Sequence, residues 1–280
     1  MGSPEGEPRL VVGEDRSTGG PSRVARRRLA DFSSGTIAFS AVLLAAGLAG
    51  CKGSEPAAPP LPSLPLIASI ALDINEPSDL AIDETGTLLW TVSNNPDSVY
   101  QLDTAGKRLK TLKYAGQNLE GIAYDPATAS LWVAEENQRS LVHLDLDGNV
   151  IQKYDLALTG EQNSGLEGVS LDGSGLLVVL NEKLPGMFIQ LNPNITIASK
   201  DTLTFAGDYS GITYEPASAS FWIVSDQSHR LYRWTKAGGV SQQFDLPFPK
   251  PEGVAFDPAT NRVYVVTDGE NRMYVYQYTP

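Results

Sequence analysis

Side chains that carry oxygen recur at two positions of this 280-residue chain, about 16 residues apart. Each residue at the first position precedes a glycine or, in one case, an aspartate: Ser78, Glu120, Glu167, Ser210 and Glu252. Each residue at the second position follows an apolar run: Asn94, Glu136, Glu182, Asp226 and Asp268. Seven of the ten are carboxylates, and carboxylates held close together must share protons or a cation. Calcium takes oxygen ligands at roughly 2.3–2.6 Å. We therefore predict a cation or ligand site, with calcium as the first choice of ion and magnesium as the second.

A purely structural role for the same residues stays open. A glutamate before a glycine can accept backbone N–H bonds from a neighbouring unit, and an acid after a strand can form a turn. The two roles can coexist. We assign no catalytic residue, because the chain has only two histidines, His143 and His229, and neither lies in a nucleophile motif.

A repeat positions these residues. Its core recurs around residues 79, 121, 168, 211 and 253, at spacings of 42, 47, 43 and 42 residues. After each core come an acidic turn, an apolar run, an alternating run and a more polar run. Period-2 alternation and turns rich in Gly, Pro and Asp indicate four short strands per unit. A period in this range is typical of an array of equal supersecondary units.

These features predict an all-β fold, a five-bladed β-propeller of four-stranded blades. The fifth repeat has only three strands, whereas one unassigned strand, 66–74, precedes the first repeat. We expect this N-terminal strand to join the last blade and close the ring, which removes the free edges. An open β-solenoid or two packed sandwiches are the alternatives. The first strand of each propeller blade lines the axis, so both sets of oxygen-bearing residues should meet at one mouth of the channel.

The N-terminal region has the features of an export signal and not those of a folded domain. Arg26-Arg27-Arg28 precede a short apolar stretch that ends at Leu48-Ala49-Gly50-Cys51, as in a secretory signal. The last four residues resemble the bacterial lipoprotein lipobox, which implies cleavage before Cys51 and its lipidation. We therefore predict a lipoprotein signal peptide with a long n-region over 1–50, a lipidated Cys51 with a Pro-rich tether over 51–65, and the propeller over 66–280.

Charge and cysteine content exclude several classes. The chain carries 21 basic and 33 acidic residues, and the part after residue 50 has a net charge of −13. Such a balance argues against nucleic acid and against a polybasic membrane-binding surface, and favours cations as ligands. With Cys51 as the single cysteine, a disulfide within the chain is impossible.

Two strings carry a family resemblance: Asn118-Leu119-Glu120-Gly121-Ile122-Ala123-Tyr124-Asp125 and Gly165-Leu166-Glu167-Gly168-Val169. With the leader, they resemble the SdiA-regulated (YjiK-like) family of bacterial envelope β-propeller proteins over roughly residues 66–280. The resemblance implies a propeller at the cell envelope, with no established biochemical activity. Ser78 and Ser210 depart from the family's Glu-Gly pattern, so a fully five-fold ring of carboxylates is not expected.

Three functions remain open at this point. We favour a membrane-anchored binding module that holds a cation, a small ligand or an envelope protein at the top face of the channel. A calcium-dependent hydrolase of phosphoester or lactone type and a structural envelope protein are the alternatives, so an enzymatic role is not favoured. The expected location is the bacterial cell envelope, at the outer membrane or cell surface rather than the inner membrane. We expect a monomer, with the membrane as partner through the lipid anchor and no nucleic acid.

Overall fold

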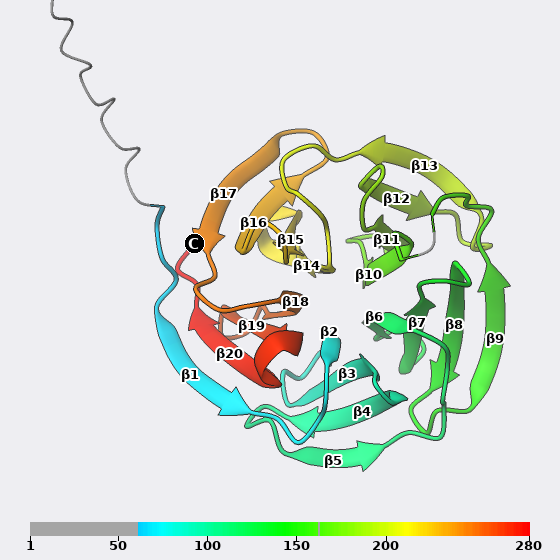
Figure 1. Cartoon of the computed structure of the whole chain (residues 1–280), viewed down its shortest axis with the longest axis horizontal. Helices are drawn as coiled ribbons and strands as arrows, with labels where there is room; N and C mark the ends of the chain where they lie inside the picture. The colour runs from blue at the N-terminus through cyan, green and yellow to red at the C-terminus, as the bar shows by residue number, and fades with distance from the viewer. Residues whose placement is uncertain (1–60, 162) are drawn as a thin grey trace, which may run out of the picture. The chain divides into compact units, whose positions relative to one another are not determined.

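The computed structural model describes residues 61–161 and 163–280, which form five four-stranded antiparallel sheets. Figure 1 shows these sheets arranged radially around one axis, which confirms the predicted five-bladed propeller. From the axis outward, blades one to three are β2 (Pro77–Ile82), β3 (Leu88–Asn94), β4 (Asp97–Asp103), β5 (Arg108–Thr111); β6 (Leu119–Asp125), β7 (Ser130–Glu135), β8 (Ser140–Asp145), β9 (Val150–Asp155); and β10 (Leu166–Leu171), β11 (Leu177–Asn181), β12 (Met187–Leu191), β13 (Ile197–Thr202). Blades four and five are β14 (Gly211–Glu215), β15 (Ser220–Ser225), β16 (Arg230–Thr235), β17 (Gly239–Asp245); and β18 (Pro251–Asp257), β19 (Arg262–Thr267), β20 (Arg272–Gln277), β1 (Leu66–Ala71).

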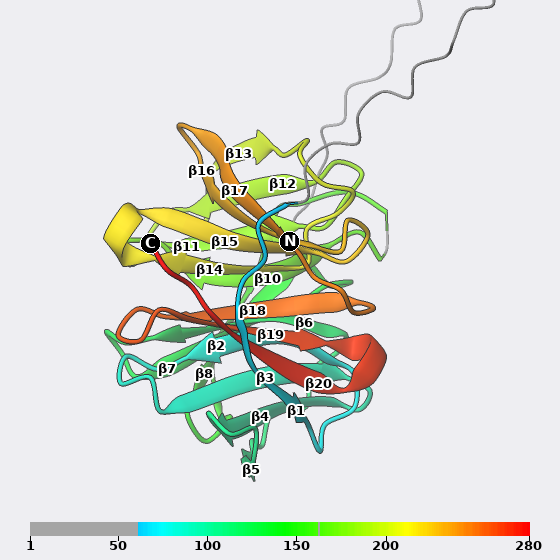
Figure 2. The same cartoon turned by 90° about the vertical axis from the view of Figure 1, so that its left-hand side faces the viewer.

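The N-terminal strand closes the ring, as predicted. β1 pairs with β20 antiparallel, from Leu66 opposite Tyr276 to Ala71 opposite Arg272. Figure 2 shows the two strands side by side at the outside of the last blade. The strand ends at Ala71 rather than at residue 74, because β20 begins at Arg272, and only the Leu72 N–H continues the pairing, to the Asn271 carbonyl oxygen at 2.8 Å. The N-terminal strand therefore covers the outer edge of β20, which would otherwise be unpaired.

The core lies between neighbouring blades. Strand residues alternate toward one blade face or the other, and their apolar side chains interdigitate across the gap. The Trp90 ring stacks on Tyr124 of the next blade with 5.1 Å between the ring centroids. Trp222, which is fully buried, packs against Phe256 of the next blade with the rings tilted by 30° and 6.0 Å between their centroids. Large aromatic rings at the same register thus join successive blades into one rigid ring.

The predicted signal peptide, Cys51 and most of the tether lie outside the described residues. Of the tether, Pro65 accepts a hydrogen bond from the Gln277 N–H, and Leu64 packs on the core of blade five. Within 61–161 and 163–280, no helix is long and apolar enough to cross a membrane. The only helical segments described are two single 3-10 turns, η1 (Pro216–Ser218) and η2 (Asp268–Glu270).

Candidate functional site

All ten oxygen-bearing positions line one cavity of about 230 Å³. This acidic cavity opens at the end of the axis where the inner strands begin. Its lining comprises the ten positions and three further residues: Ser78, Asn94, Glu120, Glu136, Asn163, Glu167, Glu182, Lys183, Asp208, Ser210, Asp226, Glu252 and Asp268. Eight of these side chains are carboxylates, and among the described residues only one lining side chain, Lys183, is cationic.

Strand geometry explains the convergence. Glu120, Glu167 and Glu252 are each the second residue of an inner strand, in β6, β10 and β18. Glu136 and Glu182 directly follow the second strands β7 and β11. In an antiparallel pair the start of one strand lies beside the end of the other. Each blade therefore delivers its two oxygen-bearing residues to the same end of the axis.

Glu120 takes part in a hydrogen bond between blades, although its donor is a side-chain amide and not the backbone N–H that the sequence suggested. The Asn94 amide of blade one donates to Glu120 Oε1 of blade two at 2.7 Å. This bond joins neighbouring blades and leaves Glu120 with an ordinary partner. At the equivalent place beside Glu167, blade two offers Glu136, a carboxylate that cannot donate a hydrogen bond when it is ionised.

Glu167 is consequently in a different situation. Its side chain is nine-tenths buried, and no donor among the described residues hydrogen-bonds to it. One carboxylate oxygen from each of Glu136, Glu167 and Glu182 lies within 4.8 Å of the other two. Glu136 has donors of its own, the Asn118 amide and the Gly165 N–H. The cavity thus contains a largely buried acid that lies close to two further acids.

Five acids of the cavity, Glu120, Glu167, Glu182, Asp226 and Glu252, have a raised pKa. Burial, opposed by hydrogen bonds from Asn94 and Ser78, raises the pKa of Glu120 to about 7. Burial also raises the pKa of Glu167 well above its usual value, and the charges of Glu120, Glu182, Glu252 and Glu136 add to this rise. The pKa of Glu252 is raised well above its usual value by burial and by Asp226. A cation in the cavity would relieve the same repulsion that these protons relieve.

Two acids at the rim are paired with lysines. Lys183 Nζ contacts Glu182 Oε1, and Lys250 Nζ contacts Asp268 Oδ2. Burial raises the pKa of Glu182 in spite of Lys183, and burial together with Asp208 raises the pKa of Asp226. Positive charge is therefore supplied at the rim, whereas Glu167 lies deeper and has no such partner among the described residues.

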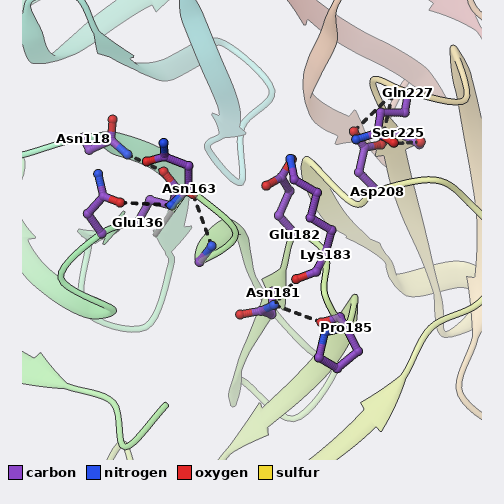
Figure 3. A network of polar contacts seen from close by, with 12 residues as sticks. Asn118, Glu136, Asn163, Asn181, Glu182, Lys183, Pro185, Asp208, Ser225 and Gln227 are labelled. Carbon is purple, nitrogen blue, oxygen red and sulfur yellow. Dashed lines mark hydrogen bonds and ion pairs between the residues drawn. The ribbon is translucent and has the colours of Figure 1, made fainter. Parts of the chain in front are cut away.

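Three residues that line the cavity were not predicted as site residues: Asn163, Lys183 and Asp208. Asp208 accepts hydrogen bonds from the Ser225 hydroxyl at 2.6 Å and from the Gln227 N–H at 3.1 Å. Figure 3 shows Glu182 and Lys183 between this group and the group formed by Asn118, Glu136 and Asn163. Asp208 lies three residues before Gly211, and Ser210 replaces the usual glutamate of that repeat. The missing carboxylate at residue 210 was the signal that could have drawn attention to Asp208.

Neither histidine of the sequence lines the cavity. The His143 ring stacks on Trp132 at 4.1 Å, and its Nε2 is 2.6 Å from the Ser130 hydroxyl. His229 Nδ1 lies 3.0 Å from the Phe248 carbonyl oxygen. Proton transfer within the acidic cavity would therefore fall to its carboxyl groups.

Comparison with known proteins gives one family match and several similar folds. The sequence model of the family described as SdiA-regulated matches residues 67–277. A catalytically inactive virginiamycin B lyase from Staphylococcus aureus, solved with quinupristin, is 19% identical and has a TM-score of 0.48; 73% of this chain and 71% of that chain are covered. The Cps50 (Swd1) β-propeller domain of Myceliophteria thermophila is 8% identical with a TM-score of 0.49 and coverage of 76% and 100%. A protein of unknown function from Bacteroides caccae is 9% identical with a TM-score of 0.50 and coverage of 68% and 70%. At these identities none of the three structures transfers an activity to this chain.

Proposed function

This chain belongs to the SdiA-regulated family, and from that premise we propose that it is a membrane-anchored binding module whose acidic cavity holds a divalent cation, calcium in the first place. The observation that carries the proposal is Glu167. A carboxylate that is largely withdrawn from water and faces other carboxylates is stabilised by a proton or by a cation. Among the described residues Glu167 has no hydrogen-bond donor, and carboxylate oxygens of Glu136 and Glu182 lie within 4.8 Å of one of its own.

The spacing of the three glutamates fits a single ion. Calcium bonds to oxygen at roughly 2.3–2.6 Å, so two ligands on opposite sides of the ion lie about 5 Å apart. The three carboxylate oxygens fall within 4.8 Å of one another. Calcium accepts six to eight ligands in flexible geometry, so ligands beyond the three glutamates would be needed. Water or an oxygen of a bound molecule would supply them, which is how a cation site serves a binding module.

Titration of the purified protein tests the cation. After removal of metal by a chelator, addition of calcium is expected to release or absorb measurable heat and to raise the melting temperature. At a calcium concentration about 100 times the dissociation constant, the gain in stability is about 2.7 kcal/mol. Magnesium is the matched comparison, because it requires shorter bonds and stricter octahedral geometry. Absence of both heat and a melting shift with either ion would contradict the proposal.

The cation-free protein is expected to lose stability as the pH rises from about 5 to 8. Glu120 has a pKa of about 7 in the folded chain against 4.5 ordinarily. The folded state therefore binds more protons than the unfolded state in this range, and this contribution is lost as the pH rises through the folded pKa. His143 acts in the opposite direction, because burial lowers its pKa. The measurement is therefore the melting temperature of wild type against Glu120→Gln: the variant should fall less steeply with pH. Equal slopes would show that Glu120 does not titrate in this window.

The anchor is the second part of the proposal. The Leu48-Ala49-Gly50-Cys51 string and the prolines that follow it support a lipidated N-terminus that holds the propeller away from the membrane at the outer membrane or cell surface. The partners of the cavity would then be small ligands or proteins of the envelope.

Replacement of the single cysteine tests the anchor. Cys51→Ser is expected to abolish labelling by a fatty-acid analogue and to move the protein from the membrane fraction to the soluble fraction, because acyl chains provide the membrane affinity. No other cysteine can take over the modification. Recovery of Cys51→Ser in the membrane fraction in the same amount as the wild type would refute lipid anchoring at this residue.

A further inference from the structure

One position that recurs in all five inner strands lies between the acidic cavity and a second cavity on the propeller axis. It is occupied by Asp79 in blade one and by glycine in the other blades, at 121, 168, 211 and 253. The residue before each of these positions lines the acidic cavity. Residues after each of them line a second cavity of about 240 Å³, among them Leu80, Ile122, Val169 and Ile212. We call the five residues, which line neither cavity, the axial ring.

The glycines of the axial ring let neighbouring backbones touch. A Cβ on Gly121 would lie 2.0 Å from the carbonyl oxygen of Glu167 in the next blade. A Cβ on Gly211 would lie 2.5 Å from the carbonyl oxygen of Glu252. The inner strands β2, β6, β10, β14 and β18 thus surround the axis closely (Figure 1). The single side chain of the ring is that of Asp79, and it is completely buried.

The Asp79 carboxylate accepts backbone N–H bonds from more than one blade. The Leu80 N–H donates to Oδ1 at 2.8 Å, and the Ile122 N–H of blade two donates to Oδ2 at 3.0 Å. Burial raises the pKa of Asp79, whereas the N–H groups of Ile122, Leu80, Val254 and Val169 oppose this rise by hydrogen bonding to the carboxylate. Each of these four N–H groups belongs to the residue just after the ring position of its blade.

The pairing of the inner strands explains why these N–H groups are free to turn toward the axis. The register shifts just before the ring position in the pairs β2–β3 and β6–β7, and across it in the pairs β10–β11 and β18–β19. Such a β-bulge leaves one residue unpaired in the ladder. The inner strand of blade four, β14, pairs with β15 without a shift. Blade four is also the one blade whose corresponding N–H group, that of Ile212, is not among those that oppose the rise in the pKa of Asp79.

We propose that the N–H groups that follow these bulges, with those of Leu80 and Ile122 in direct contact, form an anion-binding ring on the propeller axis, that Asp79 is its built-in ligand, and that this side chain closes the axis between the two cavities. The ring is an anion site because several N–H groups converge on one point away from water. Asp79 is the one side chain of the ring position that can occupy it, so a ligand in the acidic cavity enters and leaves by the same mouth.

The test uses Asp79→Gly, which gives blade one the residue of the other four blades. The emptied ring is expected to take up a small anion from solution. The melting temperature of the variant should then rise by roughly 5 °C between sodium gluconate and saturating sodium bromide at equal ionic strength. Crystals soaked in bromide should show anomalous density on the axis. Wild type and Asp257→Asn, which alters a buried carboxylate of a blade turn, should show neither effect. A folded Asp79→Gly that melts equally in both salts and has no axial bromide would overturn the proposal.

A second variant covers the case in which Asp79→Gly does not fold. Asp79→Asn keeps the size of the side chain but turns one acceptor into a donor that faces N–H groups. Because buried N–H groups then lose their acceptor, its melting temperature should fall by several degrees more than that of Asp257→Asn. An equal or smaller fall would show that the carboxylate does not hold the ring together, and would likewise overturn the proposal.

Discussion

Gly253→Ala is expected to lose more than about 3 kcal/mol of folding free energy and to be recovered mostly unfolded. The added Cβ would lie 2.3 Å from the Asp79 Cα and 2.6 Å from its carbonyl carbon. Overpacked cores usually cost about 1–3 kcal/mol because flexible side chains move aside. Here the obstacle is the backbone of the next blade, so relief requires that two inner strands move apart. Denaturant unfolding followed by tryptophan fluorescence measures the loss.

Gly238→Ala is the matched control for this prediction. The added Cβ would meet only the Thr235 side-chain hydroxyl at 3.0 Å, in the exposed turn between β16 and β17. This variant should stay within about 1 kcal/mol of wild type. If Gly253→Ala unfolds at the same denaturant concentration as Gly238→Ala, close contact at the axial ring does not set the stability of the propeller.

Glu167→Gln is expected to weaken calcium binding by about 100-fold or more. Loss of a partner in the outer shell of a metal site already costs about 10–100-fold, and an amide in place of a direct carboxylate ligand removes a charge as well. The cation-free variant should be at least as stable as the cation-free wild type, since a neutral side chain replaces a buried acid that faces other acids. Calorimetric titration and melting without metal measure the two effects separately.

Glu84→Gln supplies the control, because it makes the same chemical change at an exposed acid that lines the second cavity. Its calcium affinity should equal that of the wild type. A Glu167→Gln protein that binds calcium as tightly as Glu84→Gln would place the cation elsewhere. A Glu167→Gln protein that is less stable than the wild type without metal would indicate that the carboxylate serves the structure.

Much of the architecture could be predicted from the sequence, because alignment of the five repeats identifies the equivalent residues of each blade. The spacing of residues 79, 121, 168, 211 and 253 sets the number of blades, and the unassigned strand before the first repeat predicted the closure that β1 provides. The convergence of the ten oxygen-bearing residues followed from strand order alone. These features follow from the periodicity of the repeat, which can be recognised in a single sequence.

The partners of individual side chains in the cavity could not be predicted, because they depend on which residues of neighbouring blades face each other. Glu120 and Glu167 occupy the same place in the repeat, yet only Glu120 accepts an amide, because Asn94 stands where the next blade has Glu136. The Asn94–Glu120 contact joins two neighbouring blades. Alignment of the repeats shows which residues are equivalent in different blades, but not which of them touch. Asp79 is a similar case. Its difference from the four glycines is visible in the sequence, but its role depends on β-bulges that no residue pattern marks.

A crystal structure of the protein grown with saturating calcium, with anomalous data collected for that ion, tests the cation site most directly. We predict one anomalous peak in the acidic cavity, about 2.3–2.6 Å from a carboxylate oxygen of Glu167 and in contact with Glu136 and Glu182. Crystals with no peak in this cavity, in which the Glu167 carboxyl is hydrogen-bonded only to protein groups or water, would contradict it.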